Sequence, residues 1–496
     1  MSLMLLGSHG ILWRLGSSTR RTSASLLLGS AILVPLLASA GDVPDDGPAL
    51  GPYDERITQE QITSGRMRLR AIRRAGLQIF ATPFNHEDGY GEGPMDPTNP
   101  DYTSPGNRPM LGSNGTMLRV NGLDTQTCLE CHSLVSAATI PATLGVGGAG
   151  GISTTALFQA KFFDVADAAG NFFAAFDGRA INPLSLFGAG GVQLAAKEMT
   201  LELQALLQQA LASPAGTRVD LVAKGISFGY LVAGGLGVVD TSHVEGIDPD
   251  LVVRPFGRKG EFSSLRAFDL GATQFHMGMQ PVEVAGEGID ADRDGISDEL
   301  LIGEISALEI FIATMDSPVR EEMGVAANNG FQSFQNIGCS DCHRPTLETE
   351  SRVLGFSFPE IPTDPQANVF YSVDLSERPA LFPAIEGAGL LVELFSDLKR
   401  HDMGDDLAED FDRATDQQNR EFITAKLSGV ADTAPYLHDG RALTLYEAIL
   451  WHGGEAQTAH DAFVALPEDA QAEIVAFLKT LRNPSSPNRD VIGLMR

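Results

Sequence analysis

The apolar positions of this chain recur mostly at helical rather than strand spacing. Near its end, Ile474, Phe477, Leu478 and Leu481 fall at positions i, i+3, i+4 and i+7, which places them on one face of a helix. One proline opens this segment and another follows it, as is common at helix ends. The spacing therefore predicts an amphipathic helix that packs this face against a core.

Other segments follow the same spacing. Residues 76–80 and 330–334 both read Gly-x-x-x-Phe within a helical pattern, and further helices are expected over residues 197–211 and 303–315. The Val-, Gly- and Leu-rich stretch 218–255 is expected to hold a small hairpin. The chain has 53 glycines and 27 prolines, so we expect long irregular loops between the helices. Two such Gly-rich loops are expected at residues 145–151 and 188–191. The fold class is expected to be mainly α.

One predicted helix carries a histidine on its apolar side. The segment from Thr444 to His452 is closed by two glycines, and Leu445, Ala448, Ile449 and His452 fall at i, i+3, i+4 and i+7. Successive positions of this kind share a helix face, so His452 is expected to point inward.

The cysteines give the first chemical signal. All four lie in two copies of Cys-x-x-Cys-His, at residues 128–132 and 339–343. This pattern attaches c-type haem covalently, with two thioether bonds from the thiols and the adjacent histidine as proximal iron ligand. A zinc site would gather both cysteine pairs around one ion and would leave the histidines unexplained. The expected haem-binding residues are Cys128, Cys131, His132, Cys339, Cys342 and His343.

The helical segments and the haem motifs together indicate two cytochrome c-like haem domains. In cytochrome c domains, a helix like that at 330–334 packs against the C-terminal helix. We expect a first haem domain over 41–318, with Gly-rich insertions, and a second over 319–496, with the boundary at Asp316-Ser317-Pro318.

The sixth ligand of each iron decides the chemistry, because a haem with two strong protein ligands transfers electrons and an open one can bind peroxide or oxygen. For the second haem the candidates are His452 and Met403, of which His452 is favoured because it shares an inward face. The first haem is expected to be either open or capped by His276, Met277 or Met279. A weak repeat aligns residues 265–278 with 427–440, and it would place His276 near the first haem as His438 lies near the second.

An acidic loop follows these residues. Asp290, Asp292 and Asp294 occupy positions 1, 3 and 5, and a glycine occupies position 6, as in the first half of an EF-hand loop. The bidentate glutamate of position 12 is missing, so Asp298 or Glu299 would replace it, together with the carbonyl of Ile296. The loop predicts a calcium site.

The first 40 residues have the features of a secretory signal peptide. Arginines precede a mostly apolar stretch from Leu26 to Leu37, and Ala38-Ser39-Ala40 is a small-residue cleavage site. We therefore expect a periplasmic protein without a membrane span after signal removal. The net charge of −29 disfavours nucleic acid and anionic membranes and suits a small basic electron donor, such as a cytochrome c or a cupredoxin.

Several segments together resemble the dihaem oxidoreductases, putative peroxidases, within the wider bacterial dihaem cytochrome c peroxidase superfamily. The strongest match is Ala434-Pro435-Tyr436-Leu437-His438-Asp439-Gly440-Arg441-Ala442, continuing from Thr444 to Ala456. His401-Asp402-Met403-Gly404, the acidic loop with residues 302–314, and both haem motifs also match. The resemblance covers most of residues 60–484.

The resemblance implies roles for individual residues. The residue fourteen after the histidine of His-Asp-Gly is the distal ligand of the electron-transfer haem, usually Met; here it is His452, which implies a lower potential. His438 would lie beside that haem without ligating it. The first haem would be the peroxidatic one, and either His276 or Glu283, depending on the register, would move a proton between the peroxide oxygens.

The resemblance implies an enzyme that reduces hydrogen peroxide at the first haem with electrons relayed through the second. Two alternatives remain. One is an electron-transfer cytochrome with two six-coordinate haems, and the other is a dihaem oxidase or oxygenase with a protein or organic substrate. Family membership alone does not choose among these activities.

Overall fold

The computed structural model describes residues 56–90, 126–134, 157–163, 176–292, 294–409 and 416–492. The predicted signal peptide and the Gly-rich loop at 145–151 lie outside these residues. Within them the chain is mainly helical, with thirteen α-helices and short antiparallel strands. The helices are α1 Gln59–Thr63, α2 Leu69–Ala81, α3 Ala189–Ala212, α4 Leu265–Met277, α5 Val282–Ala285, α6 Ile302–Ala313, α7 Val325–Asn336, α8 Cys339–Cys342, α9 Asp416–Arg420, α10 Leu445–Leu450, α11 Gln457–Val464, α12 Glu468–Leu478 and α13 Arg489–Ile492.

The described strands pair only with antiparallel neighbours. β3, β4 and β5 form a three-stranded sheet that packs on α3, and the others form two-stranded pairs: β1 with β2, β6 with β13, β7 with β10, β8 with β9 and β11 with β12. Their bounds are β1 Leu157–Phe163, β2 Phe176–Ile181, β3 Arg218–Ala223, β4 Ile226–Gly235, β5 Val238–Asp240, β6 Val319–Arg320, β7 Leu347–Glu348, β8 Val353–Ser357, β9 Val369–Asp374, β10 Leu391–Val392, β11 Arg400–Asp402, β12 Glu421–Ile423 and β13 Leu481–Arg482.

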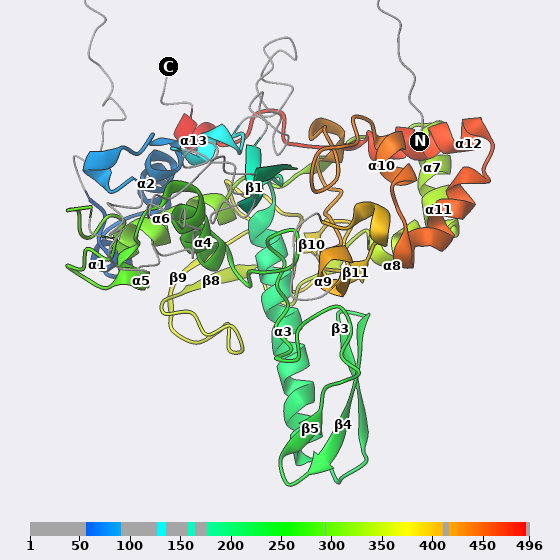
Figure 1. Ribbon diagram of the computed structural model, residues 1–496, viewed down its shortest axis with the longest axis horizontal. Coiled ribbons are helices and arrows are strands. Elements are labelled where there is room, and N and C mark those ends of the chain that lie inside the picture. The colour runs from blue at the N-terminus through cyan, green and yellow to red at the C-terminus, as the bar shows by residue number, and fades with distance from the viewer. Residues whose placement is uncertain are drawn as a thin grey trace, which may run out of the picture. The chain divides into compact units, whose positions relative to one another are not determined.

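The predicted packing of α7 against α12 is confirmed. A Cβ atom added at Gly330 would lie 1.8 Å from the carbonyl oxygen of Glu473, so the absence of a side chain lets the two helices touch backbone to backbone. Phe334 packs beside this crossing with its ring centroid 5.3 Å from that of Phe477. These helices gather with α8, α10 and α11 around one small core (Figure 1).

The first half of the chain repeats this arrangement with α2 and α6. At Gly76 an added Cβ would lie 2.1 Å from the carbonyl oxygen of Ala307, and Phe80 stacks edge-on against Phe311 at 5.8 Å. Both crossings therefore depend on a glycine at the point of closest approach. The sequence predicted the helix at 76–80 but not α6 as its partner.

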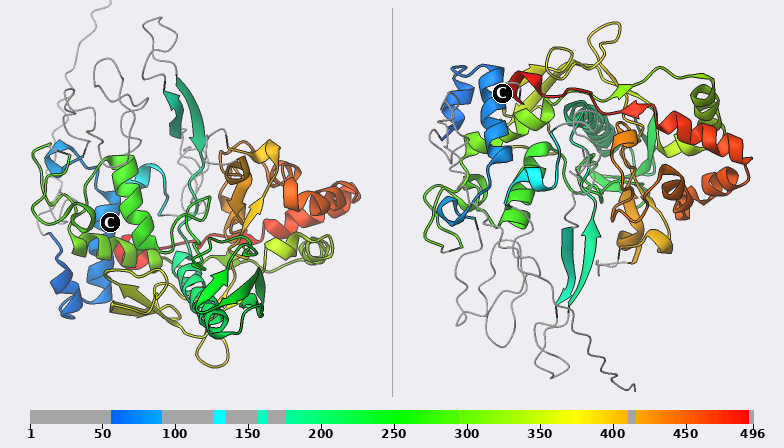
Figure 2. Two further views of the ribbon diagram at one scale, coloured as in Figure 1. Left: turned by 60° about the horizontal axis from the view of Figure 1, so that its bottom comes forward. Right: turned by 90° about the horizontal axis from the view of Figure 1, so that it is seen from above.

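The last helix returns to the first half. The guanidinium of Arg73, fully buried on α2, bonds to the carboxylate of Asp490 on α13 at 2.8 and 2.9 Å and to the carbonyl of Thr314 at 2.8 Å. Figures 1 and 2 both show α13 beside α2. The domain boundary expected after Pro318 stays a prediction.

Some expected elements differ in extent. Gly190 and Gly191 are not part of a loop but belong to the first turn of α3, where an added Cβ would meet the carbonyl oxygen of Ala313 at 1.9 Å or the ring of Phe382 at 2.4 Å. These glycines therefore serve close packing. Leu481 lies in β13 beyond α12, and the expected hairpin at 218–255 is a three-stranded sheet. No helix among the described residues is both long and apolar enough to cross a membrane.

Candidate functional site

The second haem motif forms a single helical turn. α8 begins after Gly338, whose φ is 92°, and Cys339 and Cys342 lie three residues apart on one side of the turn. His343 follows, and its ring Nδ1 donates a hydrogen bond to the carbonyl of Phe395 at 3.0 Å. A carbonyl only accepts, so this bond leaves the Nε2 lone pair free for a metal. Burial, then the neighbouring His452, lowers the pKa of His343 to about 4, which keeps the ring neutral.

His452 faces this histidine. It lies just past α10, whose N-terminus is fixed by a capping box between Thr444 and Glu447. Its Nδ1 donates to the carbonyl of Ala448 at 2.9 Å, and burial lowers its pKa. The ring centroids of His343 and His452 lie 6.3 Å apart.

This separation fits one iron held between the two rings. Each metal–nitrogen bond to a histidine is about 2 Å and each ring adds its own radius, so two imidazoles on one ion have centroids roughly 6 Å apart. Both rings also carry the backbone hydrogen bond at Nδ1 that metal-bound histidines usually make. Met403, the competing ligand, follows β11, and its amide donates to the carbonyl of Arg420 at 3.0 Å.

The first haem motif is organised in the same way. Cys128–Glu130 form a 3₁₀ turn whose N-cap, Thr127, accepts from the amide of Leu129 and donates to the carbonyl of Phe80 at 2.9 Å. This bond ties the motif to the end of α2. The Nδ1 of His132 donates to the carbonyl of Leu184 at 3.0 Å. Burial lowers the pKa of His132 to about 4, so its Nε2 can also act as a neutral metal ligand.

Helix α4 brings two titratable groups to this motif. His276 is close enough to add to the lowering of the His132 pKa. Asp269, two turns earlier on the same face, is 3% exposed, and its charge adds to burial in raising the pKa of the Cys128 thiol. Burial, then the charge of Glu309, raises the pKa of Asp269 well above its usual range. Sequence reasoning missed Asp269, although its helical register with His276 could have revealed it.

Glu283 lies elsewhere. This residue of α5 accepts hydrogen bonds from the buried Arg266, at 2.5 Å from Nη2 and 2.9 Å from Nε. The structure therefore brings His276 toward His132 and directs Glu283 to Arg266. The roles of both residues stay predictions.

The proposed repeat between residues 265–278 and 427–440 is wrong. Residues 265–277 form the α-helix α4, whereas the second segment contains only a 3₁₀ turn at Val430–Asp432, followed by a cis bond before Pro435 and by Leu437 with φ 71°. Proline has no amide hydrogen and cannot continue a helix, so a few shared identities do not impose one backbone.

His438 stacks on an aromatic ring. Its centroid lies 4.6 Å from that of Phe422, and the ammonium of Lys259 lies 3.4 Å from the Phe422 centroid. Burial lowers the pKa of His438. Its carbonyl accepts from the amide of Asn182 at 2.9 Å, which joins this loop to the segment that holds His132. Its role beside a haem stays a prediction.

The acidic loop gathers its carboxylates. Asp290, Asp292 and Asp294 each offer an oxygen, and these oxygens lie within 4.8 Å of one another. Burial, then the charge of Asp294, raises the pKa of Asp292 to about 7. Gly295 has φ 96° and allows the sharp turn that position 6 requires. Three acids at this spacing suit a hard cation such as calcium.

Asp298 and Glu299, the two candidates for the additional calcium ligand, lie in different surroundings. The Asp298 carboxylate accepts from the amide of Gly288 at 2.6 Å. Glu299 is 2% exposed, accepts from the amide of Gln280 through Oε2 at 2.6 Å, and has an Oε1 with no hydrogen-bond partner among the described residues. Burial raises the pKa of Glu299 to about 9, and the three loop aspartates add to the shift. Glu299 is therefore the better placed fourth acid. The Ile296 amide donates to Asp294 at 2.7 Å, and its carbonyl stays a predicted ligand.

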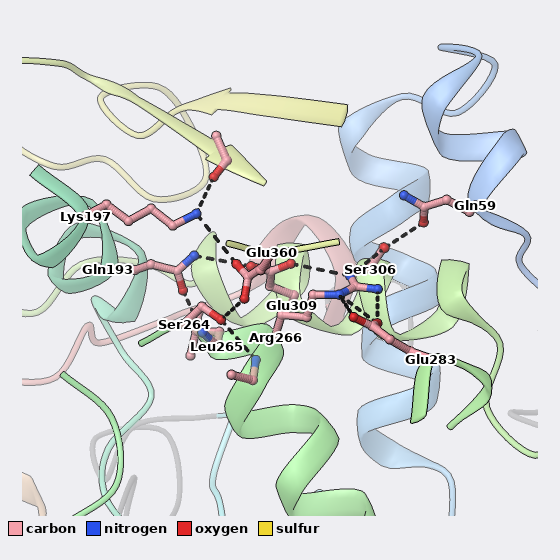
Figure 3. Close-up of polar contacts among 12 residues, drawn as sticks. Gln59, Gln193, Lys197, Ser264, Leu265, Arg266, Glu283, Ser306, Glu309 and Glu360 are labelled. Carbon is pink, nitrogen blue, oxygen red and sulfur yellow. Dashed lines mark hydrogen bonds and ion pairs between the residues drawn. The ribbon is translucent and has the colours of Figure 1, made fainter. Parts of the chain in front are cut away.

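A buried polar network lies next to α4 (Figure 3). Arg266 is its centre and bonds to Glu283 and, at 2.9 Å, to the hydroxyl of Ser306. Gln193 of α3 donates to Glu309 at 3.2 Å and accepts from the amide of Leu265 at 2.8 Å. Burial, then the charge of Glu360, raises the pKa of Glu309 to about 7. The network fixes α3, α4 and α6 relative to one another and so holds the helix that carries Asp269 and His276.

Comparison with known proteins gives two kinds of match. A model of the family described as "Di-haem oxidoreductase, putative peroxidase" matches residues 380–481. Among solved structures, hydrazine synthase from Kuenenia stuttgartiensis under 20 bar xenon is 18% identical, with a TM-score of 0.26 over 60% of this chain and 87% of that chain. A MauG-like protein associated with microbial copper homeostasis is 16% identical, with a TM-score of 0.27 over 60% and 90%. Scores this low carry no conclusion about the present chain. No curated protein matches it.

The matched residues contain His401, His438 and His452, and they include the helix α12 that packs on α7. The resemblance inferred from the motifs is thereby confirmed. Haem is the cofactor of this family, and its chemistry is oxidation and reduction. Over residues 380–481, the chain is therefore similar to the di-haem oxidoreductase, putative peroxidase family, and this match indicates an oxidoreductase.

Proposed function

We propose that this protein is a periplasmic enzyme with two covalently bound c-type haems that reduces hydrogen peroxide to water. The observation that carries the proposal is the pair of partly buried imidazoles of His343 and His452, whose centroids lie 6.3 Å apart and which would hold one iron between them. A haem with two histidine ligands is closed to substrate and has a lower potential than a Met-ligated haem. The second haem would therefore accept electrons, and the first would bind peroxide.

Bound haem supplies the redox chemistry, in which one hydrogen peroxide takes up two electrons and two protons and yields two water molecules. The chain supplies the rest. Both cysteine pairs would fix the porphyrins, and His132 and His343 would hold the irons through Nε2. His276 on α4 would move a proton between the peroxide oxygens, since it lies near His132. Glu283 holds the guanidinium of Arg266, which lies in the first turn of the same helix.

The two helix crossings support a pair of cytochrome c-like domains. Gly76 and Gly330 give α2 with α6, and α7 with α12, the same backbone contact, and each glycine-bearing helix precedes a haem motif. In this proposal the domains span 41–318 and 319–496. The segment 1–40 would direct export, and the donor would be a small basic cytochrome c or cupredoxin attracted by the net charge of −29.

The acidic loop would bind calcium through Asp290, Asp292 and Asp294, the carbonyl of Ile296 and one further acid. Glu299 is favoured for the last position because it is buried and one of its oxygens has no hydrogen-bond partner in the described part of the chain, although the sequence offered Asp298 equally. The loop follows α5 and leads into α6, so a bound ion would fix these two helices relative to one another.

The test is low-temperature EPR on the purified holoprotein, first oxidised and then half-reduced, after haem content has been measured. A high-spin ferric signal in either state, lost on addition of peroxide and accompanied by turnover of reduced cytochrome c, is the expected result. Two low-spin signals that remain low-spin on half-reduction, with no response to peroxide, would overturn the peroxidase proposal.

One observation favours a second function. The nearness of His276 to His132 would also let His276 ligate the first iron. Both haems would then be six-coordinate, and the protein would be an electron-transfer cytochrome. The same EPR experiment separates the two functions, because His276→Ala would convert the first haem from low-spin to high-spin only if His276 is a ligand.

A further inference from the structure

The loops that hold the two proximal histidines are joined by a short run of hydrogen bonds and peptide units. It begins at the His132 ring, whose Nδ1 donates to the carbonyl of Leu184 at 3.0 Å. The next carbonyl, that of Ser185, accepts from the Nζ of Lys426 at 3.2 Å. The link therefore passes from the first haem site to a residue 241 positions further along the chain.

The run continues through the backbone after Lys426. The amide of Leu427 donates to the carbonyl of Leu394 at 3.1 Å. The following carbonyl, that of Phe395, accepts from Nδ1 of the His343 ring at 3.0 Å. Four hydrogen bonds and the intervening covalent segments thus connect the two imidazoles, and apart from the histidines themselves Lys426 contributes the one side chain in the run.

The same two segments are also joined beside this run. The side-chain amide of Asn182 donates to the carbonyls of Pro435 and Leu437 at 2.8 and 2.9 Å. Residues 182–185, which accept the His132 hydrogen bond, are therefore held to residues 426–438 by several hydrogen bonds.

The surroundings make Lys426 an unusual lysine. The residue is partly buried, and desolvation lowers the pKa of its ammonium to about 8. Its charge is also among the contributions that lower the His132 pKa. A positive charge close to an iron ligand favours the reduced state of that iron, because ferrous haem carries one positive charge fewer than ferric haem.

We propose that Lys426 is a positioning residue that couples the two haems, because its side chain closes the run of hydrogen bonds from the His132 ring to the His343 ring. This inference rests on the proposed function, in which both histidines ligate haem iron. In the coupled step one electron leaves the second haem, which is oxidised, and enters the first, which is reduced. No bond is made or broken, and Lys426 keeps its protons.

The experiment measures the rate of electron exchange between the haems in the holoprotein after reduction by a flash-generated flavin radical. Lys426→Met removes the donor and the charge at nearly constant length, Lys426→Arg retains both, and Lys479→Met on the exposed end of α12 is the matched control. The expected result for Lys426→Met is about tenfold slower exchange, equivalent to about 1.4 kcal/mol in the barrier, together with a lower midpoint potential for the first haem only. Lys426→Arg should restore the rate, and Lys479→Met should not change it.

Haem content and the spectrum of the second haem separate the possible failures. If Lys426→Met retains both haems and exchanges electrons at the parental rate, the inference is overturned, whatever happens to the potentials. If the parent protein itself lacks one of the haems, the proposed function fails instead. If Lys426→Met loses a haem, the rate in Lys426→Leu, which is shorter and likewise lacks a hydrogen-bond donor, decides by the same criterion.

Discussion

The imidazoles of His343 and His452 face one another with centroids 6.3 Å apart, although the residues are 109 positions apart in the sequence. Each ring is oriented by its own backbone carbonyl, that of Phe395 for one and that of Ala448 for the other. Two independent hydrogen bonds at Nδ1 therefore fix the orientations of two rings that lie close together. A chance meeting of two core histidines would not require both rings to be oriented in this way.

Changing His452 is expected to alter the second haem without affecting its attachment. His452→Met should raise the midpoint potential of this haem, because a thioether ligand favours ferrous iron more than an imidazole does. His452→Ala should leave the iron with an open position and produce a high-spin ferric EPR signal. The measurement is a redox titration followed by EPR. His460→Ala, which removes a histidine from the neighbouring α11, should retain the parental spectrum, and an unchanged spectrum in His452→Ala would rule out this ligand.

Substitution of Gly330 is expected to destabilise the helix crossing. Gly330→Ala places a Cβ 1.8 Å from the Glu473 carbonyl oxygen, so α7 and α12 must separate, at a cost of about 1–3 kcal/mol in the free energy of unfolding. Gly324→Ala, at the N-cap of the same helix, meets no atom within 4 Å and should cost at most about 1 kcal/mol. Denaturant unfolding of both holoprotein variants checks the difference. Equal losses would mean that the close approach does not matter.

Two variants can identify which residue moves a proton between the peroxide oxygens. His276→Gln should lower turnover with peroxide by about 100-fold or more, since general acid–base groups contribute at least this much. Glu283→Gln should instead lower stability by about 3 kcal/mol, because the buried Arg266 loses its charged partner. Steady-state kinetics and thermal unfolding of both proteins decide the matter. A large loss of turnover in Glu283→Gln with normal stability would favour the alternative alignment with the family, in which Glu283 and not His276 moves the proton.

The pKa of Glu309 predicts a specific dependence of stability on pH. Burial, then Glu360, raises this pKa from 4.5 in the unfolded chain to about 7 in the folded one. Between these values the folded state holds a proton that the unfolded state has lost, so stability falls as pH rises from about 4.5 to 7. Glu309→Gln should remove this contribution, and the variant should gain about 3 kcal/mol relative to the parent at pH 8 compared with pH 4.5. Urea unfolding at both pH values provides the measurement. The same difference between variant and parent at both pH values would contradict the assignment.

Calcium should stabilise the holoprotein. Chelation with EGTA is expected to lower Tm, because an ion that binds only the folded state stabilises it by mass action. Asp294→Asn and Glu299→Gln should each weaken binding by about tenfold or more, whereas Asp298→Asn should have a smaller effect, since that carboxylate is occupied by the amide of Gly288. Calorimetric titration with calcium compares the three. A stronger effect of Asp298→Asn would restore Asp298 as the ligand.

The sequence predicted local features well and spatial partners less well. The α7–α12 crossing could be predicted because a helical stripe and a glycine encode it within a few residues. The first turn of α3 could not, because Gly190 and Gly191 serve contacts with Ala313 and Phe382, which are distant in sequence. From the sequence alone, a glycine that allows close helix packing therefore cannot be told from a glycine in a loop.

The same limit applies to the candidate site. The haem motifs and His452 follow from spacing alone. Asp269 and Lys426 belong to no recognisable sequence motif. They reach the His132 site only because α4 and residues 424–427 pack beside it. The apparent repeat failed for the opposite reason, since identities at matching positions took no account of the proline that prevents a helix at 427–440.

The contact between Arg73 and Asp490 has a consequence for how the protein reaches its native state. These residues are 417 positions apart, and the guanidinium is fully buried. The guanidinium of Arg73 on α2 therefore cannot complete its hydrogen bonds until Asp490 has been synthesised. A buried arginine without its carboxylate is costly, so the early half should remain incompletely folded until then. Docking of α13 on α2 is therefore expected to be the step that completes the packing of the first half. In the proposed function, the first Cys-x-x-Cys-His motif would stay accessible for haem attachment until then.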